Sequence, residues 1–155
     1  MVRPTNEKRV QAIRALARVA RLLERSSGDL NLAHYRVLAA VADGDERASR
    51  VADRLALGKP TVSAAVESLY KRGLLSREDA VDDRRAATLT LTSAGEAALA
   101  EVERVMLERI DDLCARTADG DRVLAALGEL GEALDEVAAE RAAQRAEKRA
   151  RPVPK

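Results

Sequence analysis

Few side chains in this sequence combine the type and the spacing that catalysis or metal binding needs. His34 is the only histidine and Cys114 the only cysteine, so neither a cluster of histidine and cysteine ligands nor a disulfide within the chain can form. A serine–histidine–acid triad lacks a nucleophile motif such as Gly-x-Ser-x-Gly. We therefore expect no enzyme, with no catalytic residues, no metal site and no cofactor.

His34 and Cys114 both have an ordinary structural interpretation. We expect His34 to be a partly buried helix residue, and a place in a ligand cleft is the alternative. We expect Cys114 to be a buried structural thiol near the end of a long helix, and a redox sensor is the alternative. The sequence leaves both alternatives open.

Hydroxyl and cationic side chains offer a better lead, because their spacing places them together on one helix. Val62, Val66 and Leu69 follow each other at i, i+4 and i+7, which predicts a buried stripe. The opposite face then carries small or polar residues, namely Thr61, Ser63, Ala64, Ser68 and Lys71. Such residues permit close approach to a duplex and form hydrogen bonds with base edges or phosphates.

The distribution of charge agrees with this lead. Net charge is only +1. Residues 47–77 carry seven basic and two acidic residues, whereas residues 86–140 carry four basic and thirteen acidic residues. This pattern indicates a polyanion-binding segment on a non-binding scaffold, and ordinary solvated helix faces are the alternative.

Composition indicates a helical protein. The chain has 155 residues, 46% hydrophobic and 34% charged, with Tyr35 and Tyr70 as its only aromatic residues. A core of Leu, Val, Ile and Ala suits helices better than sheets. The sequence contains no apolar run of about 20 residues and no signal-peptide pattern after Met1, so we expect a cytoplasmic protein without a membrane partner.

Periodicity and capping signals predict the elements around this helix. Helices are expected over residues 7–25, 32–42 (with Asn31 as N-cap), 48–55 and 60–72. Gly58 makes the tight turn before the last of these, and Gly73 caps its C-terminus. Residues 88–92 alternate Thr and Leu and predict a strand that pairs with a segment beginning at Leu74. A long helix then starts near Ser93, capped by Ser93 or Thr92, and its inward positions are Leu99, Val102, Met106, Ile110 and Leu113. Another helix follows the break at 119–121 and is expected to fray from Arg141 onward.

Short helix, turn, second helix and hairpin together predict a winged helix-turn-helix, in which the second helix enters the major groove. Arg84 and Arg85 lie at the predicted hairpin tip, where an arginine can reach the minor groove. The expected fold class is mainly α with a small β-hairpin wing. Apolar stripes on the first and last helices are too long for one small domain to cover, so another chain must bury them.

Four runs carry a more specific resemblance: LALGKPTVS at 55–63, VESLYKRGLLSR at 66–77, DRRA at 83–86 and LTLTSAG at 89–95. Their order and spacing resemble the multiple-antibiotic-resistance-regulator (MarR) family of transcription factors. The run LNLAHYRVL at 30–38 is similar to the second helix of that family. Close matching covers about residues 30–95.

The resemblance implies a homodimer whose two winged domains bind a palindromic operator in double-stranded DNA, most often as a repressor. Residues 1–28 and 94–150 are then dimerisation helices, 30–93 the DNA-binding domain and 151–155 a disordered tail. The implied DNA-binding residues are Lys59, Pro60, Thr61, Ser63, Ala64, Ser68, Lys71, Arg77, Asp83, Arg84 and Arg85. One departure is the acidity of the wing, where Asp79, Asp82 and Asp83 require arginine partners if the loop is not to repel phosphate.

The resemblance also implies release by a small aromatic or anionic effector, for which Arg14, Arg18, His34 and Tyr35 are the candidate ligands. Two further functions remain open. One is a small-molecule sensor with weak or vestigial DNA binding. The other is a non-specific architectural binder that uses the basic tail over residues 142–155.

Overall fold

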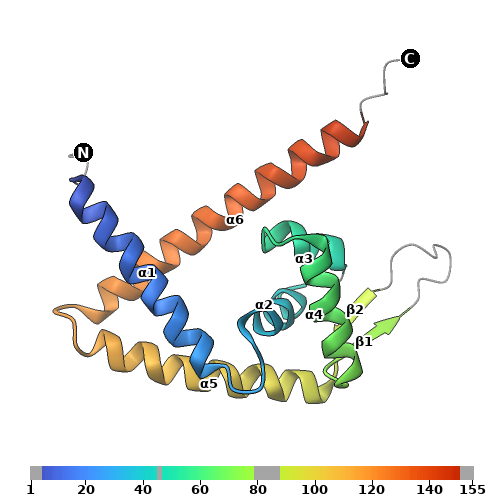
Figure 1. Ribbon diagram of the computed structural model, residues 1–155, viewed down its shortest axis with the longest axis horizontal. Coiled ribbons are helices and arrows are strands. Elements are labelled where there is room, and N and C mark those ends of the chain that lie inside the picture. Colours follow the sequence, from blue (N-terminus) through green and yellow to red (C-terminus); the bar gives the residue numbers. More distant parts are fainter. Residues whose placement is uncertain (1–4, 45–46, 79–87, 151–155) are drawn as a thin grey trace.

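A computed structural model describes residues 5–44, 47–78 and 88–150 of the chain. These residues form six helices and one hairpin (Figure 1). The elements are α1 (Asn6–Ser26), α2 (Leu32–Ala42), α3 (Ala48–Arg54), α4 (Lys59–Lys71), β1 (Leu75–Glu78), β2 (Thr88–Leu91), α5 (Ser93–Cys114) and α6 (Gly120–Ala150). The predicted fold class, helical with a small hairpin, is confirmed.

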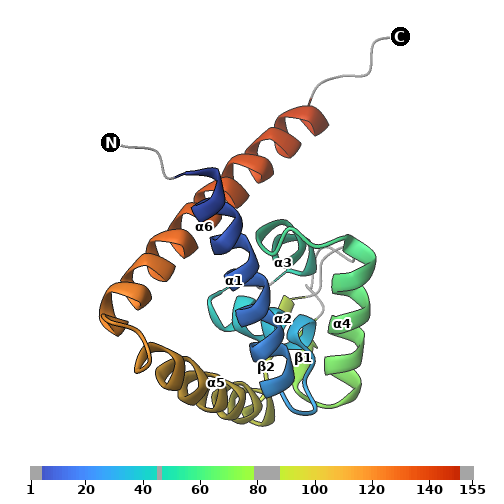
Figure 2. The ribbon, with the colours of Figure 1, turned by 60° about the vertical axis from the view of Figure 1, so that its left-hand side comes forward.

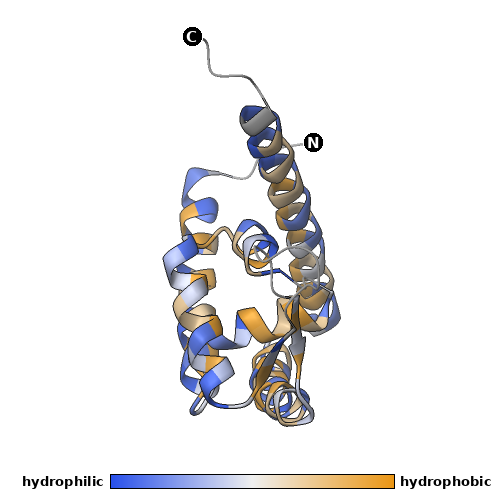
Figure 3. Cartoon of the chain, turned by 90° about the vertical axis from the view of Figure 1, so that its right-hand side faces the viewer, coloured by the Kyte–Doolittle hydropathy of each residue, from blue (hydrophilic) through white to orange (hydrophobic). Residues whose placement is uncertain are grey.

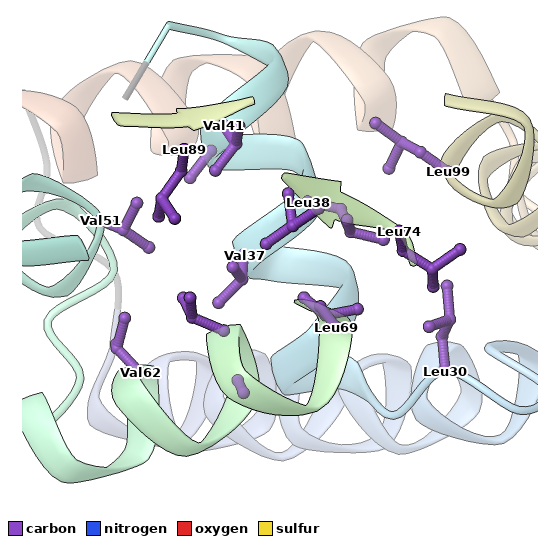
Figure 4. Close-up of a cluster of buried hydrophobic side chains, with 14 of the residues drawn as sticks. Leu30, Val37, Leu38, Val41, Val51, Val62, Leu69, Leu74, Leu89 and Leu99 are labelled. Carbon is purple, nitrogen blue, oxygen red and sulfur yellow. The ribbon is translucent and has the colours of Figure 1, made fainter. Parts of the chain in front are cut away.

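The core lies where α2, α3 and α4 meet the hairpin. Val37, Leu38, Val51 and Leu69 are inaccessible to solvent, and Figure 4 shows side chains from these helices and from the hairpin converging on one cluster. The predicted stripe of Val62, Val66 and Leu69 is buried in it. Burial of these aliphatic groups holds α4 against α2 and leaves its other face outside.

The ends of α2 and α5 follow hydrogen-bonding side chains. Asn31 accepts a hydrogen bond from the His34 amide over 2.8 Å, which confirms it as the N-cap of α2. At α5 the cap is Thr92, whose hydroxyl accepts from the Gly95 amide at 3.0 Å. Thr92 has an extended backbone whereas Ser93 is already helical, so the Thr92 side chain and not that of Ser93 is placed to bond an amide of the first turn.

The turn between α3 and α4 differs from the prediction. Gly58 (φ −62°) is the N-cap of α4, and the left-handed residue is Ala56 (φ 51°). Leu55 caps the C-terminus of α3, and the left-handed conformation of Ala56 after it lets the Leu57 amide donate to the Ala52 carbonyl at 3.2 Å and close the end of the helix. The predicted glycine at the end of α4 is confirmed, because Gly73 has φ +69°.

The hairpin is antiparallel, with Leu75 opposite Leu91 and Arg77 opposite Leu89. Ser76 and Thr90 are paired on its other face, and their hydroxyls lie 2.5 Å apart. The connection between the strands, which includes the predicted tip residues Asp83, Arg84 and Arg85, lies outside the described residues.

Helices α1, α5 and α6 form the rest of the molecule, and Figure 2 shows α5 and α6 framing the winged domain. Of the predicted inward positions of α5, Leu99, Val102 and Met106 are buried, Ile110 is half-buried and Leu113 is exposed. The apolar stripes of α1 and α6 lie open to solvent, and Figure 3 shows hydrophobic and hydrophilic residues alternating along α6. The helix continues through residues 141–150, where the sequence predicted a fraying end.

Within the ranges described above, every helix is too short or too polar to cross a membrane.

Candidate nucleic-acid interface

Helix α4 has two chemically distinct faces. Its buried face carries Val62, Ala65, Val66 and Leu69. A helix places residues 3.6 to the turn, so the direction opposite this face is centred on positions 60, 64, 67 and 71. The helix therefore presents an outward ridge that runs along its whole length.

The predicted contact residues of α4 lie on or beside this ridge. Lys59, Pro60, Thr61, Ser63, Ala64 and Lys71 are exposed, and Ser68 is half-buried. Pro60 stands in the first turn, where its missing amide leaves no hydrogen bond unmade. The structure thus brings together the seven α4 residues that the sequence selected.

Glu67, which sequence reasoning did not select, occupies the centre of the same ridge. Its carboxylate lies 3.5 Å from the Lys71 ammonium and 3.0 Å from a guanidinium nitrogen of Arg77. The pair with Lys71 could have been found from its i, i+4 spacing. The pair with Arg77 depends on how the hairpin packs against α4, so no local pattern reveals it.

Arg77 therefore has a different environment from the α4 residues. Its guanidinium carbon lies 4.9 Å from the centre of the Tyr70 ring, within the range of a cation–π contact. Glu67 and Tyr70 are one helical turn apart on α4, and Arg77 of β1 meets both. A described part of the hairpin base is thus tied to the ridge.

The four candidate effector residues are not gathered at one place. Arg14 and Arg18 are exposed on α1. Tyr35 lines a cavity of about 380 Å³ with Leu23, Glu103 and Met106, and also a cavity of about 500 Å³ between α2, α3 and α6. Burial, followed by the nearby carboxylates of Glu103 and Asp43, raises the pKa of Tyr35. Neither Arg14 nor Arg18 lines either cavity.

His34 is half-buried beside Tyr35 on α2. Burial is the main cause that lowers the pKa of His34, and the positive charge of Arg72 lowers it further. Its Nδ1 atom is buried without a hydrogen-bond partner among the described residues. Burial and Arg72 thus favour the neutral imidazole, and the half-buried position agrees with the predicted partly buried helix residue.

Ion pairs connect α6 to the helix that precedes the ridge. Arg54 of α3 lies 2.8 Å from Asp43 and 3.7 Å from Asp135 of α6, and Arg145 of α6 pairs with Asp53 of α3.

Cys114 is a half-buried free thiol at the end of α5. Among the residues that the structure describes, no group of three His, Cys, Asp or Glu could hold a metal ion.

Comparison with known proteins shows which family model and which solved structures this chain resembles. Residues 28–86 match the model of the MarR family, and no curated protein shows significant sequence similarity to the chain. Solved structures match over most of the chain. They include the transcriptional repressor CouR bound to a 23-mer DNA duplex, at 24% identity and a TM-score of 0.70, covering 85% of this chain and 98% of that one.

Two further structures show the same fold. PcaV from Streptomyces coelicolor, in complex with its natural ligand, is 21% identical with a TM-score of 0.67 and covers 89% of this chain and 99% of its own. Wild-type MarR from E. coli, in its apo form, is 16% identical with a TM-score of 0.67 and covers 86% and 99%.

Proposed function

We propose that the protein is a transcriptional repressor that binds a palindromic operator as a homodimer, and the proposal starts from the match of residues 28–86 to the model of the MarR family. The observation that carries the proposal is the outward ridge of α4, along which Pro60, Ala64 and Lys71 are exposed and Glu67 is half-buried. Its small and hydroxyl side chains suit base edges in a major groove, and its lysines suit phosphate.

The homodimer is supported by the surface of the single chain. Its accessible area is 11954 Å², whereas a compact monomer of 16.7 kDa exposes about 7,600 Å². The excess is larger than the roughly 1,000–2,500 Å² that each protomer of an obligate dimer buries. A second copy that covers part of this area brings the chain toward the surface of an ordinary folded protein.

The position of the exposed apolar residues supports the same conclusion. Large hydrophobic side chains that are exposed lie in α1, α5 and α6, with Tyr70 the single exception among the described residues. They include Ile13 (66% exposed), Leu107 (60%) and Leu134 (69%). Water contact with so many exposed apolar side chains is unfavourable, so we assign the apolar stripes of these three helices to the dimer interface.

In the proposed complex each α4 lies in a major groove and the two helices are about 34 Å apart, one turn of the duplex. Lys59, Pro60, Thr61, Ser63, Ala64, Ser68 and Lys71 face the duplex. The hairpin connection brings Asp83, Arg84 and Arg85 toward the neighbouring minor groove, with Arg84 inserted. Arg77 lies at the base of that hairpin.

Fluorescence anisotropy with the DNA upstream of the protein's own gene tests this proposal. We expect binding that weakens steeply with salt, because phosphate contacts release counterions. Arg84→Ala should weaken it by roughly 1–3 kcal/mol, whereas the exposed α6 variant Arg122→Ala should bind as wild type. Equal affinity of Arg84→Ala and wild type contradicts the wing contact, and no binding at low salt contradicts the function.

Sedimentation analysis tests the dimer separately. Ile13→Asp places a charge in the proposed interface and should shift the protein toward monomers, because an unpaired buried charge is costly. Arg14→Asp, its neighbour on α1, changes charge without lying on the apolar stripe and serves as the control. A wild-type protein that sediments as a monomer contradicts the assignment.

A small-molecule sensor is the second candidate function, favoured by the two cavities that Tyr35 lines. The proposed effector is an aromatic or anionic compound bound where Tyr35 lines a cavity; His34, Arg14 and Arg18 do not line either cavity. Thermal stabilisation by such compounds, together with absence of operator binding, favours a sensor over a repressor. Deletion of residues 142–155 distinguishes the repressor and the sensor from an architectural DNA binder. Only the architectural binder should lose DNA affinity when this basic tail is removed.

A further inference from the structure

Tyr70 is unusual among the described residues because it is the one large hydrophobic side chain that is exposed outside α1, α5 and α6. It remains 47% exposed and lies beside the outward ridge of α4. The guanidinium of Arg77 covers its ring at 4.9 Å. Its apolar surface is therefore used to seat a cation from the hairpin.

The register of the hairpin explains why Arg77 reaches α4. Arg77 is paired with Leu89, and Leu75 with Leu91. Directly opposed residues share one face of a sheet, as do residues two apart on a strand. Arg77 is therefore on the same face as Leu75 and Leu89, which are each 2% exposed, and this face packs against the body of the domain.

Glu67 completes the arrangement. Its carboxylate lies 3.0 Å from a guanidinium nitrogen of Arg77 and 3.5 Å from the Lys71 ammonium. An unpaired carboxylate on this ridge faces the phosphates of any duplex that α4 enters, and like charges repel. The two cations offset that repulsion, and the pair with Arg77 also joins α4 to β1.

A connection of this kind matters because the hairpin is small. Each strand has four residues, and an isolated two-stranded hairpin is marginally stable in water. Buried leucines hold its base, but a hydrophobic contact is non-directional. The ion pair and the ring contact restrain direction, because a planar guanidinium must satisfy both partners at once.

We propose that Glu67, Arg77 and Tyr70 form a clasp that sets the angle between the hairpin and α4, so that both engage one duplex together. Arg77 is then a positioning residue rather than a phosphate contact, and Glu67 and Tyr70 position it. The proposal rests on the DNA-binding function proposed above.

The decisive variant is Glu67→Gln, because it should strengthen DNA binding if Arg77 is a phosphate contact and weaken it if Arg77 belongs to the clasp. If Arg77 and Lys71 are simple phosphate contacts, removal of the carboxylate frees them and strengthens DNA binding. If the clasp operates, the variant weakens binding about fivefold, the effect of losing one partly exposed ion pair. The slope of log affinity against log salt should also become shallower by about 0.9 for each hairpin phosphate contact that is lost.

Coupling between the partners provides a second measurement. Arg77→Ala should resemble Glu67→Gln, and the double variant should be no weaker than Arg77→Ala, because one clasp is lost only once. Tyr70→Leu should weaken binding less and Tyr70→Phe should leave it unchanged, since the ring is retained. Glu140→Gln on α6 controls for removal of a carboxylate elsewhere. Additive losses in the double variant overturn the clasp.

Base preference distinguishes the clasp from a direct contact between Glu67 and a base. A carboxylate on a recognition helix can accept a hydrogen bond from the amino group of cytosine. If Glu67→Gln changes preference at one base pair of each half-site while the salt slope stays constant, Glu67 reads a base directly and the clasp is overturned. The clasp predicts weaker binding to every sequence in similar proportion.

Hydrogen exchange of the free protein tests, without DNA, whether the clasp restrains the hairpin. Glu67→Gln and Arg77→Ala should raise exchange in residues 75–78 and 88–91 and leave α5 unchanged. Unchanged exchange in the hairpin refutes the clasp whatever the DNA measurements show. If exchange rises as expected but the wild type binds no duplex, the DNA-binding function fails and the clasp stands.

Discussion

The variant Gly95→Ala tests the junction that holds the hairpin, α4 and α5 together. A Cβ at residue 95 would stand 3.0 Å from the carbonyl carbon of Leu74, closer still to its oxygen and 3.3 Å from Leu91 Cδ2. The obstacle is backbone, which cannot rotate aside as a side chain does. The start of α5 and Leu74 must therefore separate by about 1 Å in a close-packed region.

The expected loss of stability combines three effects. Overpacking against backbone costs about 3 kcal/mol, the upper part of the usual range. Separation also disturbs the Thr92 hydroxyl, which accepts from the Gly95 amide at 3.0 Å and donates to the Gly73 carbonyl at 2.6 Å, a cap worth about 1 kcal/mol. The higher helix propensity of alanine returns about 1 kcal/mol. We expect a net loss of about 3 kcal/mol.

Urea unfolding followed by circular dichroism measures this loss, at one fixed protein concentration because assembly contributes to stability. Gly58→Ala is the matched control, since its new Cβ meets only ordinary contacts of 3.7 Å to Pro60 and 3.8 Å to Thr61. It should stay within about 1 kcal/mol of wild type. If Gly95→Ala is equally mild, the close approach of α5 to Leu74 is wrong.

Three further outcomes follow from the described contacts. Leu69→Ala removes a side chain with no exposed surface and should cost about 2–5 kcal/mol in the same unfolding assay. Thr92→Ala should cost about 0.5–2 kcal/mol while Thr92→Ser retains the cap, and equal losses would show that the hydroxyl is irrelevant. His34 has its pKa lowered below 6.5 by burial and then by Arg72. The unfolded chain therefore binds more protons below pH 6.5, so stability should be full above that pH and decline beneath it. His34→Gln should abolish that decline, and a decline that persists must come from another group.

Local signals were sufficient for most of the elements. The periodicity of Val62, Val66 and Leu69 predicted both α4 and its buried face, because a helix that packs on one side needs an apolar residue every three or four positions. Asn31 and Gly73 marked helix ends through chemistry confined to a single turn. Ala56 was missed because its left-handed backbone is imposed by the end of α3, and alanine itself has no preference for it.

Part of the candidate interface could also be predicted from local sequence, and part could not. Residues of α4 could be selected from sequence, since burial of one face determines which residues point outward. Glu67 could not be assigned a partner in β1, and Arg77 could not be distinguished from a phosphate contact. That distinction depends on the hairpin register, which turns Arg77 toward α4.

The sequence by itself determined the helical class, the two faces of α4 and the apolar stripes of α1 and α6, because each depends on residues within a few turns of one another. Tertiary structure alone decided that Arg77 meets Glu67 and Tyr70, that α6 pairs with α3 through Arg145 and Asp53, and that Gly95 admits no side chain. Each of these contacts joins segments whose distance and orientation are set by packing of the whole core, which no local pattern of residues encodes.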